Sequence, residues 1–272
     1  MPIITKTIYS MNEFIDESIE GIYRDNHLHF QQDFVYRGLS SSAYHLETSL
    51  TRNCRSNLNL EKSLLRNFAK HLPSEYRQNI HSIWDTMILG QHHGLPTRLL
   101  DWSYSPLIAL HFATASLENI NNDAIIWKVS VMDANKSLPS CFTDTLLSES
   151  KHIFTLEDLK NYTANSKNEL QYFETNIQNG FLFFSPPNID SRIAFQRSIF
   201  SLTTLNVNIE EYFDKNNIAA YKYIIPSDIK RELRNILDHS NITERIVFPG
   251  LEGLCQWLAR TYYTEYDCLK ST

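Results

Sequence analysis

The spacing of apolar residues along this chain changes several times, and the changes predict a mixture of helices and strands. Apolar residues three and four positions apart predict helices at 11–23, 59–71, 75–89, 157–173 and 251–263. A proline in the first turn predicts two more helices, which begin near Pro106 and Pro226. Alternating or β-branched runs predict strands at 3–8, 34–36, 124–131, 192–204 and 219–225.

The order of these elements favours one fold class. Strands and helices are intermixed without regular βαβ spacing and without a GxGxxG motif, which argues against a Rossmann fold. Residues 90–96 are expected to form a loop, and the polar stretch 135–180 is expected to be irregular apart from its one helix. The expected fold is therefore α+β, with a mixed or antiparallel central sheet flanked by helices.

Length and composition narrow the class of protein further. A chain of 272 residues fits one large domain, expected here to span 1–272, and it can build a core without disulfides or a metal. The net charge of −6 argues against a wholly basic nucleic-acid surface but leaves room for a local basic pocket. The four cysteines form no CxxC pair, and no run approaches the roughly 20 apolar residues that span a bilayer. With no signal-like N-terminus, the expected location is the cytoplasm, away from any membrane.

Arg37 is the first candidate functional residue, because it ends a short predicted strand and is followed at once by Gly38. A guanidinium offers five N–H donors in a planar fork, which suits phosphate or carboxylate oxygens. A structural ion pair with a nearby acid explains the same arginine equally well, so both interpretations stay open at this point.

The second candidate region is the segment 91–102, QHHGLPTRLLDW, where Gly94 and Pro96 predict a loop. So many hydrogen-bonding side chains form either a ligand pocket or a network in which the side chains bond to one another. Asp101 could instead cap a helix or orient a neighbour. A metal site is disfavoured, because adjacent histidines diverge and no HExxH or cysteine pair is present. The candidates are His93, Thr97, Arg98, Asp101 and Trp102.

The third candidate region is the predicted strand that contains Gln196. In a strand, Gln196 shares a face with the small residues Ala194 and Ser198, which leaves room for a ligand. A buried amide that satisfies a backbone group is an equally good explanation.

Taken together, the three regions resemble the FRG domain family, which is named for its (Phe/Tyr)-Arg-Gly motif, here Tyr36-Arg37-Gly38. The stretch 91–113, QHHGLPTRLLDWSYSPLIALHFA, is similar to the most recognisable part of that family, and the pattern continues through 192–196, 223–230 and 248–254. The resemblance covers about 30–260, which leaves 1–29 as an N-terminal strand and helix. His111 departs from the pattern, because an aromatic residue is usual there.

The resemblance also implies a function. The order of motifs is similar to a remote version of the ADP-ribosyltransferase fold, which uses NAD as its substrate. Carried over, Arg37 would hold phosphate or ribose, Gln196 would take the late-strand catalytic position, and Asp101 would complete the catalytic set. The residues expected to bind NAD are Tyr36, Gly38, His93, Thr97, Arg98 and Trp102.

Two classes of function follow. One is an NAD-dependent ADP-ribosyltransferase, acting as a toxin or phage-defence effector on RNA or protein, with an antitoxin or chaperone as a partner. Since the amide of Gln196 is neutral, Asp101 or Glu252 would have to stabilise the positive charge of the transition state. The other is a non-catalytic nucleotide- or nucleic-acid-binding module in a multi-component system. A metal-dependent nuclease ranks last, because no motif links its candidate carboxylates.

Overall fold

The central feature of the molecule is one mixed sheet. The computed structural model describes residues 3–19, 34–54, 57–78, 80–149, 151–177, 180–187 and 195–270. Within these residues, eight strands form the sheet in the order β1-β8-β4-β2-β3-β7-β6-β5. The pairs β1–β8 and β5–β6 are parallel and the others antiparallel, which confirms the expected α+β class with a mixed sheet. The strands are β1 (Ile4–Thr7), β2 (Phe34–Leu39), β3 (Leu99–Ser103), β4 (Ala124–Ser130), β5 (Phe154–Thr155), β6 (Phe181–Ser185), β7 (Ser198–Thr203) and β8 (Ala220–Ile225).

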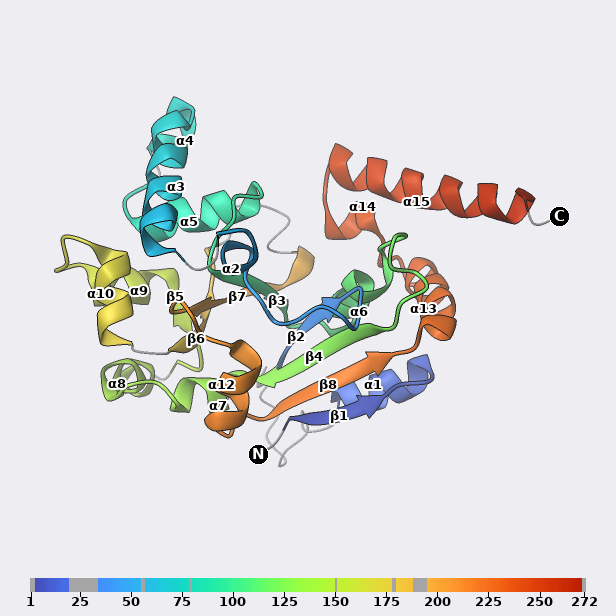
Figure 1. The fold of residues 1–272 in the computed structure, drawn as a ribbon, viewed down its shortest axis with the longest axis horizontal. Coiled ribbons are helices and arrows are strands. Elements are labelled where there is room, and N and C mark those ends of the chain that lie inside the picture. The colour runs from blue at the N-terminus through green and yellow to red at the C-terminus, as the bar shows by residue number, and fades with distance from the viewer. Residues whose placement is uncertain are drawn as a thin grey trace.

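Helices surround this sheet, and the final helix projects from the body of the molecule (Figure 1). The helices around β3, β7, β6 and β5 are α2 (Ser49–Cys54), α3 (Leu58–His71), α4 (Ser74–Arg77), α5 (Ile83–His92), α7 (Val131–Lys136), α8 (Ser140–Ser148), α9 (Leu156–Thr163), α10 (Glu169–Asn176) and α12 (Ile209–Lys215). Those around β1, β8, β4 and β2 are α1 (Met11–Ile19), α6 (Pro106–Thr114), α13 (Ser227–His239), α14 (Glu244–Val247) and α15 (Leu251–Lys270).

The sheet consists of two halves that meet at β2 and β3. β2 pairs with β4 over six residues, and β3 pairs with β7 over five. Between β2 and β3, in contrast, the described register contains one pair, Tyr36 with Ser103. Beyond this pair the two strands no longer form a ladder, so their facing backbone groups need other partners.

Helix α6 packs directly onto β2 on one face of the sheet, and Gly38 makes this close approach geometrically feasible. A Cβ atom at position 38 would lie 1.9 Å from the carbonyl oxygen of Ala109 and 2.8 Å from the backbone nitrogen of Ala113. Both are backbone atoms of α6, so neither can rotate away. The glycine of the Tyr-Arg-Gly motif therefore sets the distance between α6 and the sheet.

The helices and strands predicted from periodicity are largely present, but the prediction was wrong or incomplete in several places. The predicted helix 75–89 is two helices, because Ser82 caps a new helix by accepting from the Asp85 backbone N–H. The predicted strand 192–204 is reduced to β7; 192–194 lie outside the described residues, and Gln196 stands in a helical turn before a left-handed Arg197 (φ 47°). Strands β3 and β6 were not predicted, and 135–180 contains several helices rather than one.

Replacing Gly38 tests this close contact. We expect Gly38→Ala to lower the free energy of unfolding by about 2–4 kcal/mol, because the added methyl group collides with rigid backbone. The matched control is Gly90→Ala in α5, where the added Cβ meets the end of the flexible Leu95 side chain. Urea unfolding of the two variants gives the comparison, and equal stability of both would contradict the proposed role of Gly38.

Candidate functional site

Arg37 lies at the junction of the two sheet halves. Residues alternate across β2, so Arg37 faces away from Tyr36 and Gly38, and its side chain is half-buried. Its Nη1 donates to the backbone carbonyl of Asp101 in β3. Its Nε is buried and has no hydrogen-bond partner among the described residues. Burial lowers the pKa of the guanidinium, the Asp101 carboxylate partly offsets this, and the nearby charge of Arg52 in α2 lowers it further.

The carboxylate of Asp101 is held near Arg37 by a chain of side chains. Its Oδ2 accepts a hydrogen bond from Gln91 Nε2 at 2.8 Å. Gln91 Oε1 in turn accepts from the hydroxyl of the buried Thr97, whose backbone N–H donates to Ser49 Oγ at 3.0 Å. Arg37, Asp101 and Thr97 are thus brought together, along with Gln91 and Arg52. No role for Gln91 was predicted from the sequence, although its place at the start of the 91–113 motif was an available signal.

Arg98, in contrast, is part of a closed ion-pair cluster. Its guanidinium, 1% exposed, bonds to Glu61 in α3 and Glu174 in α10, and Glu61 is buried to the same degree. Burial disfavours its charge, but the hydrogen bonds and charges of the two glutamates outweigh this and raise its pKa. Arg98 therefore anchors α3 and α10 to the sheet and presents no free donor fork to a ligand.

Three further candidates from the sequence are core residues. Tyr36 is 2% exposed and donates its hydroxyl to the Ser18 carbonyl at 2.7 Å. Trp102 is equally buried, donates Nε1 to Ser201 Oγ at 2.9 Å and packs edge-on against Phe183. Gly38 is covered by α6. In this structure, then, neither aromatic ring is accessible for stacking on a nicotinamide.

His93 lies on the surface, where it ends helix α5 ahead of the left-handed Gly94 (φ 83°). Its ring packs edge-on against Tyr76, with centroids 6.1 Å apart, and against His92 at 5.0 Å. In the part of the chain that the structure describes, no three His, Cys, Asp or Glu side chains lie close enough to hold a metal ion.

The polar atoms of Gln196 are used within the protein. Its Nε2 donates to the Val247 carbonyl at 2.9 Å, and its Oε1 accepts from Ser198 Oγ at 3.3 Å. Its own carbonyl accepts from Ser103 Oγ at 2.6 Å. From the sequence, Gln196 was expected to share an open strand face with small residues, but the strand does not extend to position 196. The observed contacts match the alternative interpretation, a buried amide that satisfies a backbone group. Glu252 is exposed on α15, where it accepts from Gln256 at 3.2 Å.

These positions can be compared with known families. Residues 32–122 match the family model of the FRG domain. The chain contains an FRG domain. The match includes Arg37, Gln91 and Asp101, whereas Gln196 and Glu252 lie beyond it. No curated protein and no solved structure matches the chain. Among the described residues, no helix has both the length and the apolar character needed to cross a membrane.

The FRG segment also contributes a buried histidine to a charge network under α15. His111 in α6 is 1% exposed, and its Nδ1 accepts from Arg234 Nη1 of α13 at 2.9 Å. Arg234 pairs with Asp238, and Arg260 of α15 joins Asp238 to Glu244. Burial and then the charges of Arg234 and Arg260 lower the pKa of His111 to about 4, with Glu244 acting in the opposite direction. His111 is therefore neutral in the folded protein at neutral pH.

This histidine predicts a pH dependence of stability. Its pKa falls from about 6.5 in the unfolded chain to about 4 in the folded protein, so between these values the unfolded chain binds more protons. Stability should decline as pH falls through this window, by up to about 3 kcal/mol at its lower end. Urea unfolding at a series of pH values measures the slope, and His111→Phe should flatten it between pH ~6.5 and ~5. An unchanged slope in that variant would show that other groups cause the dependence.

Proposed function

We propose that the FRG domain of this chain binds a phosphorylated nucleotide at Arg37, and that NAD is the first ligand to test. The observation that carries the proposal is a buried guanidinium N–H, Nε of Arg37, without an acceptor in the described residues. Unsatisfied buried donors are uncommon in proteins and call for an explanation. Trp127, directly opposite Arg37 in the register of β4, has a second such donor in its indole N–H. An acceptor-rich group bound at this junction would satisfy such donors.

The charge balance around Arg37 supports an anionic ligand. Arg52 is exposed and close enough for its charge to lower the pKa of Arg37. Among the described residues, Asp101 is the carboxylate that offsets the positive charge around Arg37, and it already accepts a hydrogen bond from Gln91. A phosphate or pyrophosphate offers the charge and the oxygens that a pair of arginines binds well.

ADP-ribosyl transfer is the second candidate function, and Asp101 is the residue that favours it. Cleavage of the glycosidic bond of NAD develops positive charge on the ribose, which a nearby carboxylate stabilises. Asp101 is a carboxylate beside Arg37, whereas the amide of Gln196 is neutral and donates to Val247. In this scheme Arg37 binds the pyrophosphate, Asp101 stabilises the ribosyl cation, and nicotinamide leaves. A toxin or phage-defence role, with an RNA or protein acceptor and an antitoxin or chaperone partner, would rest on this reaction.

Binding is tested with an arginine variant that keeps a hydrogen-bond donor. We expect NAD, ADP or ATP to raise the melting temperature of the protein, and Arg37→Gln to weaken that binding about ten- to hundredfold, the usual contribution of a charged hydrogen bond. The control is Arg66→Gln, which changes an exposed arginine of α3 in the same FRG segment. A short RNA is included in the series, because its binding would support the nucleic-acid-binding alternative. No stabilisation by any of these ligands, or full retention in Arg37→Gln, would overturn the proposal.

Turnover is tested separately, by release of nicotinamide from NAD. If the domain is a transferase, Asp101→Asn should keep NAD binding within about threefold and lose more than about tenfold in the rate of nicotinamide release. The amide retains the size of the carboxylate and removes its charge. Binding without nicotinamide release in the wild-type protein would establish a binding module, and an equal rate in Asp101→Asn would exclude Asp101 as the stabilising group.

A further inference from the structure

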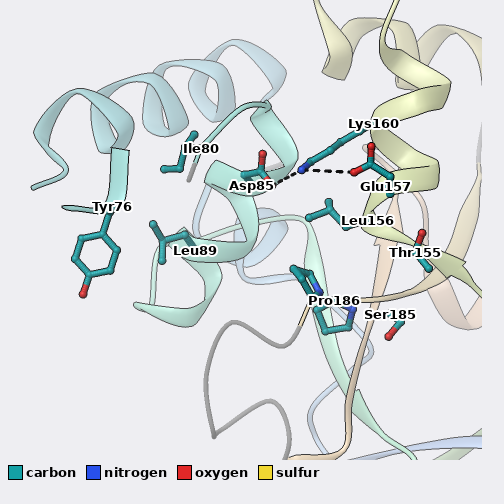
Figure 2. Close-up of a pocket in the computed structure, with 11 residues that line it drawn as sticks. Tyr76, Ile80, Asp85, Leu89, Thr155, Leu156, Glu157, Lys160, Ser185 and Pro186 are labelled. Carbon is teal, nitrogen blue, oxygen red and sulfur yellow. Dashed lines mark ion pairs between the residues drawn. The ribbon is translucent and has the colours of Figure 1, made fainter. Parts of the chain in front are cut away.

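A cavity of about 610 Å³ lies between α4, α5, α9 and the end of β6, in a part of the molecule with no assigned function (Figure 2). Its size falls in the range of sites for small organic molecules. None of the residues predicted from the sequence to form the functional site lines it. Asp85 and Leu89 of α5 form one side, and Leu156 and Lys160 of α9 form the other.

The walls of the cavity are mainly apolar. Tyr76, Leu89 and Leu156 come from three helices and Pro186 directly follows β6, and all four line the cavity (Figure 2). Tyr76 is 39% exposed, so its ring is accessible to a ligand, and the same ring packs edge-on against His93 of the FRG segment. An exposed aromatic ring and a proline ring among the lining residues favour a ligand with a flat, apolar group.

The polar side of the cavity carries more negative than positive charge. Asp85 and Lys160 form an ion pair at 2.9 Å, and Asp85 also accepts from the His81 backbone N–H and Ser82 Oγ, both at 3.0 Å. Burial by itself would raise the pKa of Asp85. The hydrogen bonds from Lys160, His81 and Ser82, together with the positive charge of Lys160, outweigh this effect and lower the pKa. Glu157 stands 4.0 Å from the same lysine and is 70% exposed. One lysine thus pairs with two carboxylates (Figure 2), and Glu157, the more distant and more exposed of the two, has capacity for a further cation.

We infer that this cavity is a binding site for a small molecule with a flat apolar body and a protonated amine or guanidine group. The apolar body would lie against Tyr76, Leu89, Leu156 and Pro186, and the cationic group would pair with Glu157. The same arrangement disfavours a carboxylate ligand, because Glu157 would repel it and Lys160 is already paired with Asp85. This site is distinct from the Arg37 junction and does not depend on the function proposed there.

The experiment compares three probes with one apolar body and different charge: phenethylamine, phenethyl alcohol and 3-phenylpropionate. Amide chemical shifts of the full-length, isotope-labelled protein are followed during titration at pH 7. We expect phenethylamine to bind with a Kd of about 0.1–10 mM, to shift the amide resonances of 85–89, 155–160 and 185, and to bind more tightly than the other two.

Two variants locate the site. Glu157→Gln should weaken phenethylamine binding about two- to fivefold, as expected for one exposed ion pair, and should leave phenethyl alcohol unaffected. Tyr76→Ala should weaken both probes about three- to tenfold. Glu118→Gln, at an exposed glutamate in the α6–β4 connection, is the matched control and should change nothing. The inference is overturned if no probe shifts these resonances, if 3-phenylpropionate binds as tightly as phenethylamine, or if Glu157→Gln and Glu118→Gln behave alike.

Discussion

One junction holds the two halves of the sheet together, and the arrangement of the FRG segment follows from it. In the described register, β2 and β3 share the single pair Tyr36–Ser103, and the guanidinium of Arg37 donates to the Asp101 carbonyl next to it. The Arg37 side chain thus connects the two strands at the point where their backbone hydrogen bonds end. Each residue of the Tyr-Arg-Gly motif has a separate task here: Tyr36 fills the core, Arg37 bridges the strands, and Gly38 admits α6.

Other buried charges fasten the surrounding helices to this frame. Arg98 connects β3 to α3 and α10 through Glu61 and Glu174. Lys230 of α13, fully buried, donates to the carbonyls of Ser40, Asn119 and Asn122 at 2.7–3.0 Å, and burial lowers its pKa to about 8. Such groups add little net stability over an apolar core, but losing one partner leaves the other buried and unpaired. These buried charges therefore determine the positions of the helices more than they increase the free energy of unfolding.

The sequence predicted the fold class and placed Arg37 and Asp101 among its candidates, but it could not show which of the polar candidates are enclosed by partners within the protein. Arg98 and Asp101 stand three positions apart in one motif, yet the first is enclosed by two glutamates and the second lies beside Arg37. The partners that make this distinction, Glu61 and Glu174, lie 37 and 76 residues away along the chain. No local pattern records such pairings. For Gln196 the error was local: Arg197, with φ 47°, interrupts a run that reads as a continuous strand.

The position of Gln196 changes how any chemistry at this domain should be understood. An amide whose N–H donates to the Val247 carbonyl links the turn before β7 to the end of α14, so it supports the fold rather than a reacting sugar. The remaining polar groups near Arg37 come from α2, α5 and β3, all within the FRG match. Among the described residues, the polar groups that approach Arg37 therefore belong to one continuous segment of sequence, at the line where the sheet divides. In the part of the chain that the structure describes, the carboxylate that lies beside Arg37 is that of Asp101, and its hydrogen bond from Gln91 both positions it and uses part of its capacity to accept. A site of this composition is better suited to holding an anion than to stabilising a cation, which is why nucleotide binding is the stronger of the two proposed functions.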